Sequence, residues 1–226
     1  MSNYRDYFKS IDFEKEWDED DWERFFQAQD KMLGEVKPGS SPAAAAPKDP
    51  SLSFRWVLRH FGIDPDDPSA EPREFAAGRA APGDFSADGA SPETLPIYCH
   101  AKCYAYRFIL FCDRAFGARL HKRYKSKAFQ VSQEILNSVL IHAAEVPRNL
   151  AAGHSLGYDR LSIMGNIARC KRALSRADTC VGFITRLSPR RLPPGEHRRL
   201  FRETVALRND IVSWITFLRR RAVQVR

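Results

Sequence analysis

Apolar residues recur at alternating steps of three and four through the last third of the chain, and this spacing restricts the fold more than any other feature. Such steps average to about 3.5 residues, the repeat of left-handed antiparallel helix packing. One stripe comprises Ile167, Cys170, Leu174, Ala177, Val181 and Ile184, and the next comprises Leu200, Thr204, Leu207, Ile211, Trp214 and Leu218. The spacing therefore predicts two long helices, 156–187 and 194–223, packed along a common seam.

Two more helices are expected before this pair. Residues 98–119 and 126–152 also show helical periodicity. Strands are not expected, because alternating apolar and polar runs bounded by turn residues are missing. Long helices joined by short connections predict an all-α fold, an antiparallel up-down four-helix bundle over residues 97–226.

The chain before this bundle has a different composition. Residues 1–36 alternate acidic and aromatic side chains, and from Asp20 onward their spacing predicts a short amphipathic helix with its acidic residues at the positive N-terminal end. This helix is too short to be stable alone, so it either docks on something or remains loosely held and solvated. Residues 37–96 are a linker and loop region rich in Pro, Ala and Gly, with one short helix at 51–63. The acidic N-terminal extension is therefore expected to be largely irregular.

Charge is divided sharply along the chain. Residues 1–100 have a net charge of −9 and residues 101–226 a net charge of +17. A basic body indicates an anionic partner, and arginine can make bidentate contacts to phosphate, so nucleic acid (RNA or DNA) is the predicted partner. Two halves that neutralise each other, or basic helix faces that are merely solvated, are the alternatives. The predicted nucleic-acid-binding residues are Lys122, Arg123, Lys125, Lys127, Arg148, Arg169, Lys171, Arg172, Arg176, Arg190, Arg191, Arg198, Arg199 and Arg202.

One short stretch resembles a motif of a known family. Residues 145–153, Glu-Val-Pro-Arg-Asn-Leu-Ala-Ala-Gly, are similar to the end of the second helix in the four-helix-bundle family of 23S rRNA intervening-sequence proteins, which is related to the accessory variability determinant of diversity-generating retroelements. Ala152 departs from the family, which has Glu there. The resemblance implies a homo-oligomer that holds RNA and a reverse transcriptase. The matching positions are Pro147, Asn149, Ala151 and Gly153.

The same stretch carries local structural expectations. Pro147 removes a backbone donor and is expected to bend its helix. Asn149 is expected to satisfy the freed carbonyl or the amides of the next helix. Gly153 is expected to end the helix in the left-handed conformation. An ordinary kinked helix terminus would have the same residues.

No catalytic, metal or cofactor site is predicted. Cys99 and Cys103 share a helical face, but no second cysteine pair completes a zinc site, so buried free thiols are expected. Phosphate-binding loops and activated nucleophiles are missing. Residues 208–213 resemble the Arg-x₄-His motif of the HEPN ribonucleases, but Ser213 replaces the histidine and a hydroxyl cannot carry protons near neutral pH. The chain is predicted not to be an enzyme, with a degenerate HEPN-like ribonuclease fold as a weaker alternative.

A protein–protein adaptor is the alternative of a different class. The acidic arm would then dock on a partner, or it would shield the basic surface until nucleic acid arrives. The chain has five cysteines, an odd number, and neither a secretory signal nor a run of about 18 apolar residues, which favours a cytoplasmic protein without membrane contact. The predicted partner-binding residues are Trp17, Trp22, Phe25 and Phe26.

Overall fold

The computed structural model describes residues 15–35, 91–112, 127–186 and 195–225, which form helices and turns. Five α-helices and one 3-10 turn occur in these ranges, and no strand does. The all-α prediction is therefore confirmed for the part of the chain that the structure describes. Within the same ranges, no helix combines the length and the apolar character that crossing a bilayer requires.

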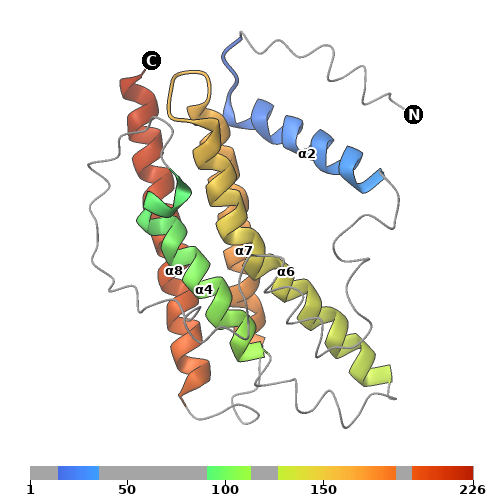
Figure 1. The fold of residues 1–226 in the computed structure, drawn as a ribbon. Helices are drawn as coiled ribbons and strands as arrows, with labels where there is room; N and C mark the ends of the chain where they lie inside the picture. Colours follow the sequence, from blue (N-terminus) through green and yellow to red (C-terminus); the bar gives the residue numbers. More distant parts are fainter. Residues whose placement is uncertain (1–14, 36–90, 113–126, 187–194, 226) are drawn as a thin grey trace.

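Four of the helices enclose one hydrophobic core. Both α4 and α7 contact α6 and α8, so each of the four packs against two neighbours. The short 3-10 turn η2 (Pro92–Thr94) leads directly into α4. Figure 1 shows that α6, α7 and α8 run in alternating directions. The four helices are α4 (Pro96–Cys112), α6 (Lys127–Leu156), α7 (Ile163–Arg186) and α8 (Glu196–Gln224).

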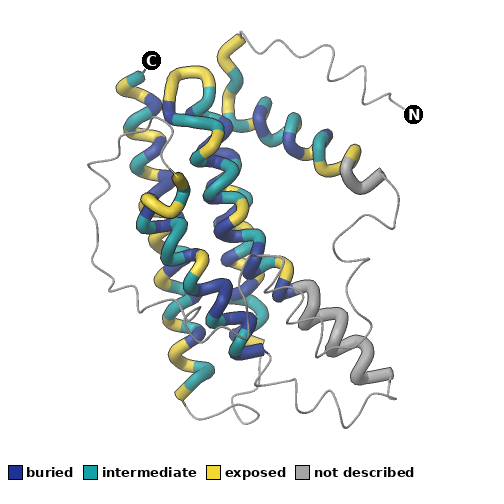
Figure 2. The backbone as a smooth tube through the Cα atoms, viewed as in Figure 1, coloured by how far each residue is buried: buried dark blue, intermediate teal, exposed yellow. Residues whose placement is uncertain are grey.

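The predicted seam of α8 is buried along its whole length, whereas the seam of α7 is buried only in part. All six predicted α8 positions are buried. On α7, Leu174 and Val181 are half-buried, and Ala173 and Cys180 are buried instead. The buried stripe of α7 is therefore rotated slightly from the predicted one. Figure 2 shows buried and exposed positions alternating along α8.

The stretch that carries the family resemblance lies inside α6. The helix continues past Pro147 to Leu156. The side-chain amide of Asn149 donates to the carbonyl of Glu145 at 2.9 Å, which is not the carbonyl of residue 143 that Pro147 frees. The expectation for Gly153 is wrong, because this residue is helical.

The turn between α6 and α7 was predicted to be helical from residue 156 onward, and this is also wrong. Gly157 has a φ of 106°, the left-handed conformation that favours glycine after a helix. The Asp159 carboxylate then accepts hydrogen bonds from the amides of Leu161 and Ser162 at 2.8 and 3.0 Å. These bonds satisfy free amides before α7 and allow the chain to reverse direction.

The N-terminal amphipathic helix is present as α2 (Glu19–Glu35), and it packs against α7. Asp18 and Asp21 form a reciprocal cap, in which each carboxylate accepts from the other residue's amide at 2.7 and 3.3 Å. Of the two states expected for this helix, docked or loosely held and solvated, the structure shows the docked one, against the chain's own helical body. The predicted short helix at 51–63 and most of the linker region 37–96 lie outside the described residues.

Candidate functional site

The aromatic face of α2 is buried against α7. Phe26 is 1% exposed and Trp22 is 9% exposed, and both pack against Ala168. A Cβ atom added to Gly165 would lie 2.8 Å from the Trp22 ring, so the absence of a side chain at this position makes room for the indole. Trp17 and Phe25 are half-buried and meet Trp22 edge to face. The four predicted partner-binding residues therefore form one aromatic cluster, two members of which are buried within the chain itself.

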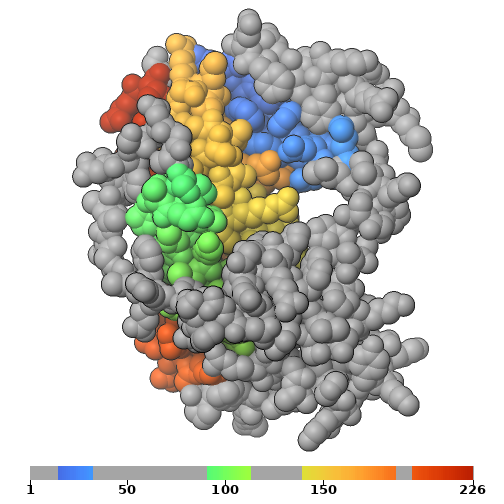
Figure 3. Space-filling view, in the orientation of Figure 1, coloured from blue at the N-terminus to red at the C-terminus, as the bar shows by residue number. Residues whose placement is uncertain are grey.

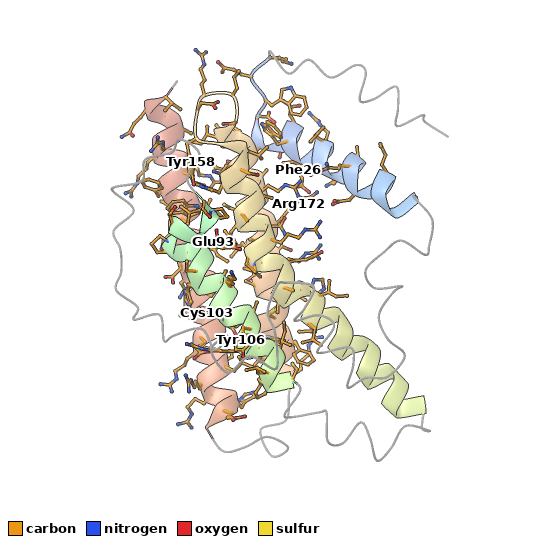
Figure 4. The ribbon with its side chains drawn as sticks, viewed as in Figure 1. Phe26, Glu93, Cys103, Tyr106, Tyr158 and Arg172 are labelled. Carbon is orange, nitrogen blue, oxygen red and sulfur yellow. The ribbon has the colours of Figure 1, made fainter. Side chains whose placement is uncertain are left out.

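The acidic side chains of α2 reach the basic residues of α7. Arg172 donates from Nε and Nη2 to the two oxygens of Glu23 at 2.9 and 3.0 Å, and from Nη1 to Asp30 at 2.6 Å. Lys171 forms an ion pair with Glu19. A bidentate guanidinium–carboxylate fork is the strongest of these contacts. Figure 4 shows Phe26 and Arg172 close together between α2 and α7.

Glu19 connects α2 to a second basic helix. Its carboxylate accepts from Nε and Nη2 of Arg219, on α8, at 3.2 Å each. Partial burial raises the pKa of Glu19, but hydrogen bonds from Arg219 and Lys171 outweigh it, so the pKa lies below its ordinary value of 4.5. Burial and the Arg172 fork act in the same way on Glu23, whose pKa is also lowered. Both carboxylates are therefore held in the charged state.

Arg169 makes a different kind of contact. Its guanidinium carbon lies 3.7 Å from the centroid of the Phe26 ring, and Nη2 donates to the neutral amide oxygen of Gln29 at 3.2 Å. Burial lowers the pKa of Arg169, and the nearby charge of Arg172 lowers it further. Among the described residues no carboxylate accepts a hydrogen bond from Arg169.

The other predicted basic residues fall into three groups. Arg176 pairs with Glu145 at 2.7 Å, and Arg199 pairs with Glu203 at 3.1 Å. Three are exposed and pair with no carboxylate in the described ranges, namely Arg148, Arg198 and Arg202. The remaining positions lie outside the described residues. Lys127 is a partial exception, because its backbone begins α6 but its side chain is not described. This last group comprises Lys122, Arg123, Lys125, Lys127, Arg190 and Arg191.

The sequence did not reveal that α2 and α7 are partners. Acidic and basic helix faces are visible separately, and neutralisation between the two halves was one of the interpretations. The acidic positions 19, 23 and 30 and the basic positions 169 and 172 recur at helical spacings. That pattern, with a glycine where the indole lies, is the signal that could have found the contact. Figure 3 shows the atoms of α2 lying against the surface of the neighbouring helices.

The other residues considered for catalysis or metal binding lie on α4, α7 and α8. Arg208 of the HEPN-like stretch donates to Asp178 at 2.7 Å, and Ser213 is exposed. Cys112, Cys170 and Cys180 are buried, whereas Cys99 and Cys103, which were expected to be buried thiols, are half-buried. Within the described ranges, no three His, Cys, Asp or Glu side chains are grouped in a way that could hold a metal ion.

Comparison with family models, with curated proteins and with solved structures finds no match to this chain.

Proposed function

We propose that this chain is a non-enzymatic, nucleic-acid-binding accessory protein, built on an antiparallel up-down four-helix bundle that forms a homo-oligomer. The observation that carries the proposal is the pair Arg198 and Arg202 on α8. They lie one helical turn apart, are exposed, and pair with no carboxylate in the described ranges. Two like charges at this spacing destabilise a helix slightly unless an anion lies across them. Phosphate is an anion that the guanidinium fork fits.

Two further features support the same reading. The net charge of residues 101–226 is +17, so the body attracts polyanions even though some of its arginines pair with the chain's own carboxylates. Exposed Arg148, on α6, adds another uncompensated cation. The reverse-transcriptase partner and the oligomer come from the family resemblance, and sizing of the protein with bound RNA would test them.

The direct test is the binding of labelled RNA and DNA to the full chain at about 50 and 200 mM salt. We expect binding at low salt that falls steeply with added salt. Removing two phosphate contacts with Arg198→Gln/Arg202→Gln should lower the slope of log K against log salt by about 1.4 for single strands. Arg220→Gln, at an exposed site near the other end of α8, is the control and should change binding less. Absence of binding to either nucleic acid at low salt would overturn the proposal.

A further inference from the structure

The face of α2 that contacts α7 carries carboxylates and aromatic rings, and single-stranded nucleic acid likewise consists of anions and flat rings. We propose that the surface of α7 beneath this helix is a binding site for single-stranded nucleic acid, which α2 occupies as an internal competitor. We call this surface the covered face; it comprises Gly165, Arg169, Lys171 and Arg172 of α7 with Arg219 of α8. The proposal rests on the proposed function, because it adds a second, occluded site to a nucleic-acid-binding body.

The carboxylates of α2 occupy positions that phosphates would fill. Arg172 donates to both oxygens of Glu23 and to one oxygen of Asp30, so it can bind two separate anionic groups at once. Lys171 and Arg219 converge on a single carboxylate, Glu19. Both arrangements suit a phosphate, which offers several oxygens to guanidinium and ammonium donors.

The aromatic rings of α2 occupy positions that bases would fill. The ring of Phe26 lies under Arg169, with the guanidinium carbon 3.7 Å from the ring centroid. The indole of Trp22 lies on the bare backbone at Gly165. Arginine planes stack on nucleobases as they do on aromatic side chains. Bases in a duplex are stacked inside the helix, so only a single strand can offer rings and phosphates together.

Arg169 shows that α2 does not fully satisfy the covered face. It is a half-buried cation, yet the group that accepts its hydrogen bond is the neutral amide of Gln29. Burial and the neighbouring charge of Arg172 lower its pKa, and the carboxylates of Asp30 and Glu23 oppose this shift only in part. A phosphate placed over Arg169 would provide a full negative charge where α2 provides an amide dipole.

The contact between α2 and α7 also has features that allow displacement. The indole Nε1 of Trp22 is buried and has no hydrogen-bond partner among the described residues, which disfavours the docked state. The Asp30 side chain is 58% exposed, so salt and water screen its ion pair. A helix of this length is not stable alone, so docking and folding of α2 are one equilibrium that a competing strand can shift.

The experiment uses full-length protein and fluorescent strands of about 15 nucleotides, oligouridylate and oligothymidylate, beside a mixed-sequence duplex. Trp22→Ala/Phe26→Ala removes the anchors of α2 without changing net charge or touching the covered face. If α2 is docked in about nine-tenths of molecules, releasing it should raise single-strand affinity about tenfold. Adding Arg169→Gln/Arg172→Gln should cancel that gain. Met32→Ala, at an exposed position on the same helix, is the control and should give wild-type affinity.

Trp22→Ser/Phe26→Ser gives a second route to the same state, because it removes the buried rings of α2 and leaves every residue of the covered face unaltered. An equal gain for duplex and single strands would overturn the single-strand assignment. If the single-strand affinity of both released variants equals that of the wild type, the covered site is overturned but the proposed function stays intact. If no variant binds any probe, the proposed function itself fails. The uridylate and thymidylate strands distinguish an RNA ligand from a DNA ligand.

Discussion

The guanidinium of Arg169 lies over the ring of Phe26, with its carbon 3.7 Å from the ring centroid, although the two residues are far apart in the sequence. Arg172 approaches the same ring more loosely, at 5.3 Å. The phenyl ring is almost wholly buried, so it contacts both a cation and the apolar residues around it. Docking of α2 therefore combines burial of apolar area with stacking under a charge that its own residues only partly compensate.

The first prediction concerns Phe26→Leu. Leucine keeps most of the apolar volume but cannot stack under Arg169, so docking of α2 should weaken by about 1 to 2 kcal/mol. Hydrogen exchange of α2 amides should then be faster by roughly tenfold, while α8 amides keep their protection. Met32→Leu changes an exposed side chain of the same helix and should leave exchange unaltered. Equal loss of protection in α2 and α8 would show that α2 cannot open independently.

The second prediction is that α2 undocks in acid. Glu19 and Glu23 have pKa values lowered below 4.5 by Lys171, Arg219 and Arg172, against the opposing effect of burial. Groups whose pKa is lowered on docking stabilise the docked state above their ordinary pKa, and this contribution is lost as the pH falls through the lowered values. Docking should therefore be constant near neutral pH and should weaken below pH 4.5.

The measurement is the ¹⁹F resonance of fluorotryptophan at Trp22, which reports the environment of the indole directly. Because the lowered pKa values are those of Glu19 and Glu23, Glu19→Gln/Glu23→Gln should remove most of the acid transition. A transition of unchanged size in that variant would locate the pH-sensitive group elsewhere.

The sequence predicted the fold well where the signal is local. Every expected seam position of α8 is buried, because periodicity within one helix determines which face can meet a core. The seam of α7 shifted toward Ala173 and Cys180, since a small residue can be buried as readily as Leu174 and helix packing decides between them. The turn before α7 was missed although Gly157 and Asp159 are ordinary signals for ending one helix and starting another.

The candidate site was predictable only in parts. Helical spacing placed Trp22 and Phe26 on one face of α2, and it placed Arg169 and Arg172 on one face of α7. Nothing local joins these two faces, because the contact depends on Gly165, whose missing side chain matters only once the indole of Trp22 lies on it. The distribution of charges along the sequence indicates which groups attract each other, but the packing of the helices decides which of them meet.

The third prediction tests a buried polar contact between α4 and α8. Thr204 is fully buried, and its hydroxyl bonds to the Leu200 carbonyl at 2.7 Å and lies 3.1 Å from the Tyr104 hydroxyl. Thr204→Val leaves the buried Tyr104 hydroxyl without this partner and should cost about 1 to 3 kcal/mol in urea unfolding. Thr216→Val, where the hydroxyl makes the same bond to a preceding carbonyl but is exposed, should cost much less. Equal costs would mean that the Tyr104 contact contributes nothing.

The fourth prediction compares two glycines in long helices. A Cβ at Gly153 would lie 2.7 Å from the Asn166 side-chain oxygen. Asn166 cannot move away freely, because its amide donates to the Gly157 carbonyl at 3.1 Å and the Cys170 thiol donates to its oxygen at 3.5 Å. Gly153→Ala should therefore destabilise the protein by about 1 to 3 kcal/mol, despite the better helix propensity of alanine.

Gly182, in α7, is the matched control. A Cβ there would meet nothing within 4 Å, so Gly182→Ala should stabilise the protein by up to about 1 kcal/mol through helix propensity alone. Opposite signs of the two changes in thermal or urea unfolding would establish that Gly153 is required for the close approach of α6 to Asn166. If Gly153→Ala is also stabilising, the two helices can separate there at little cost, and the glycine of the family-like stretch has no packing role in this protein.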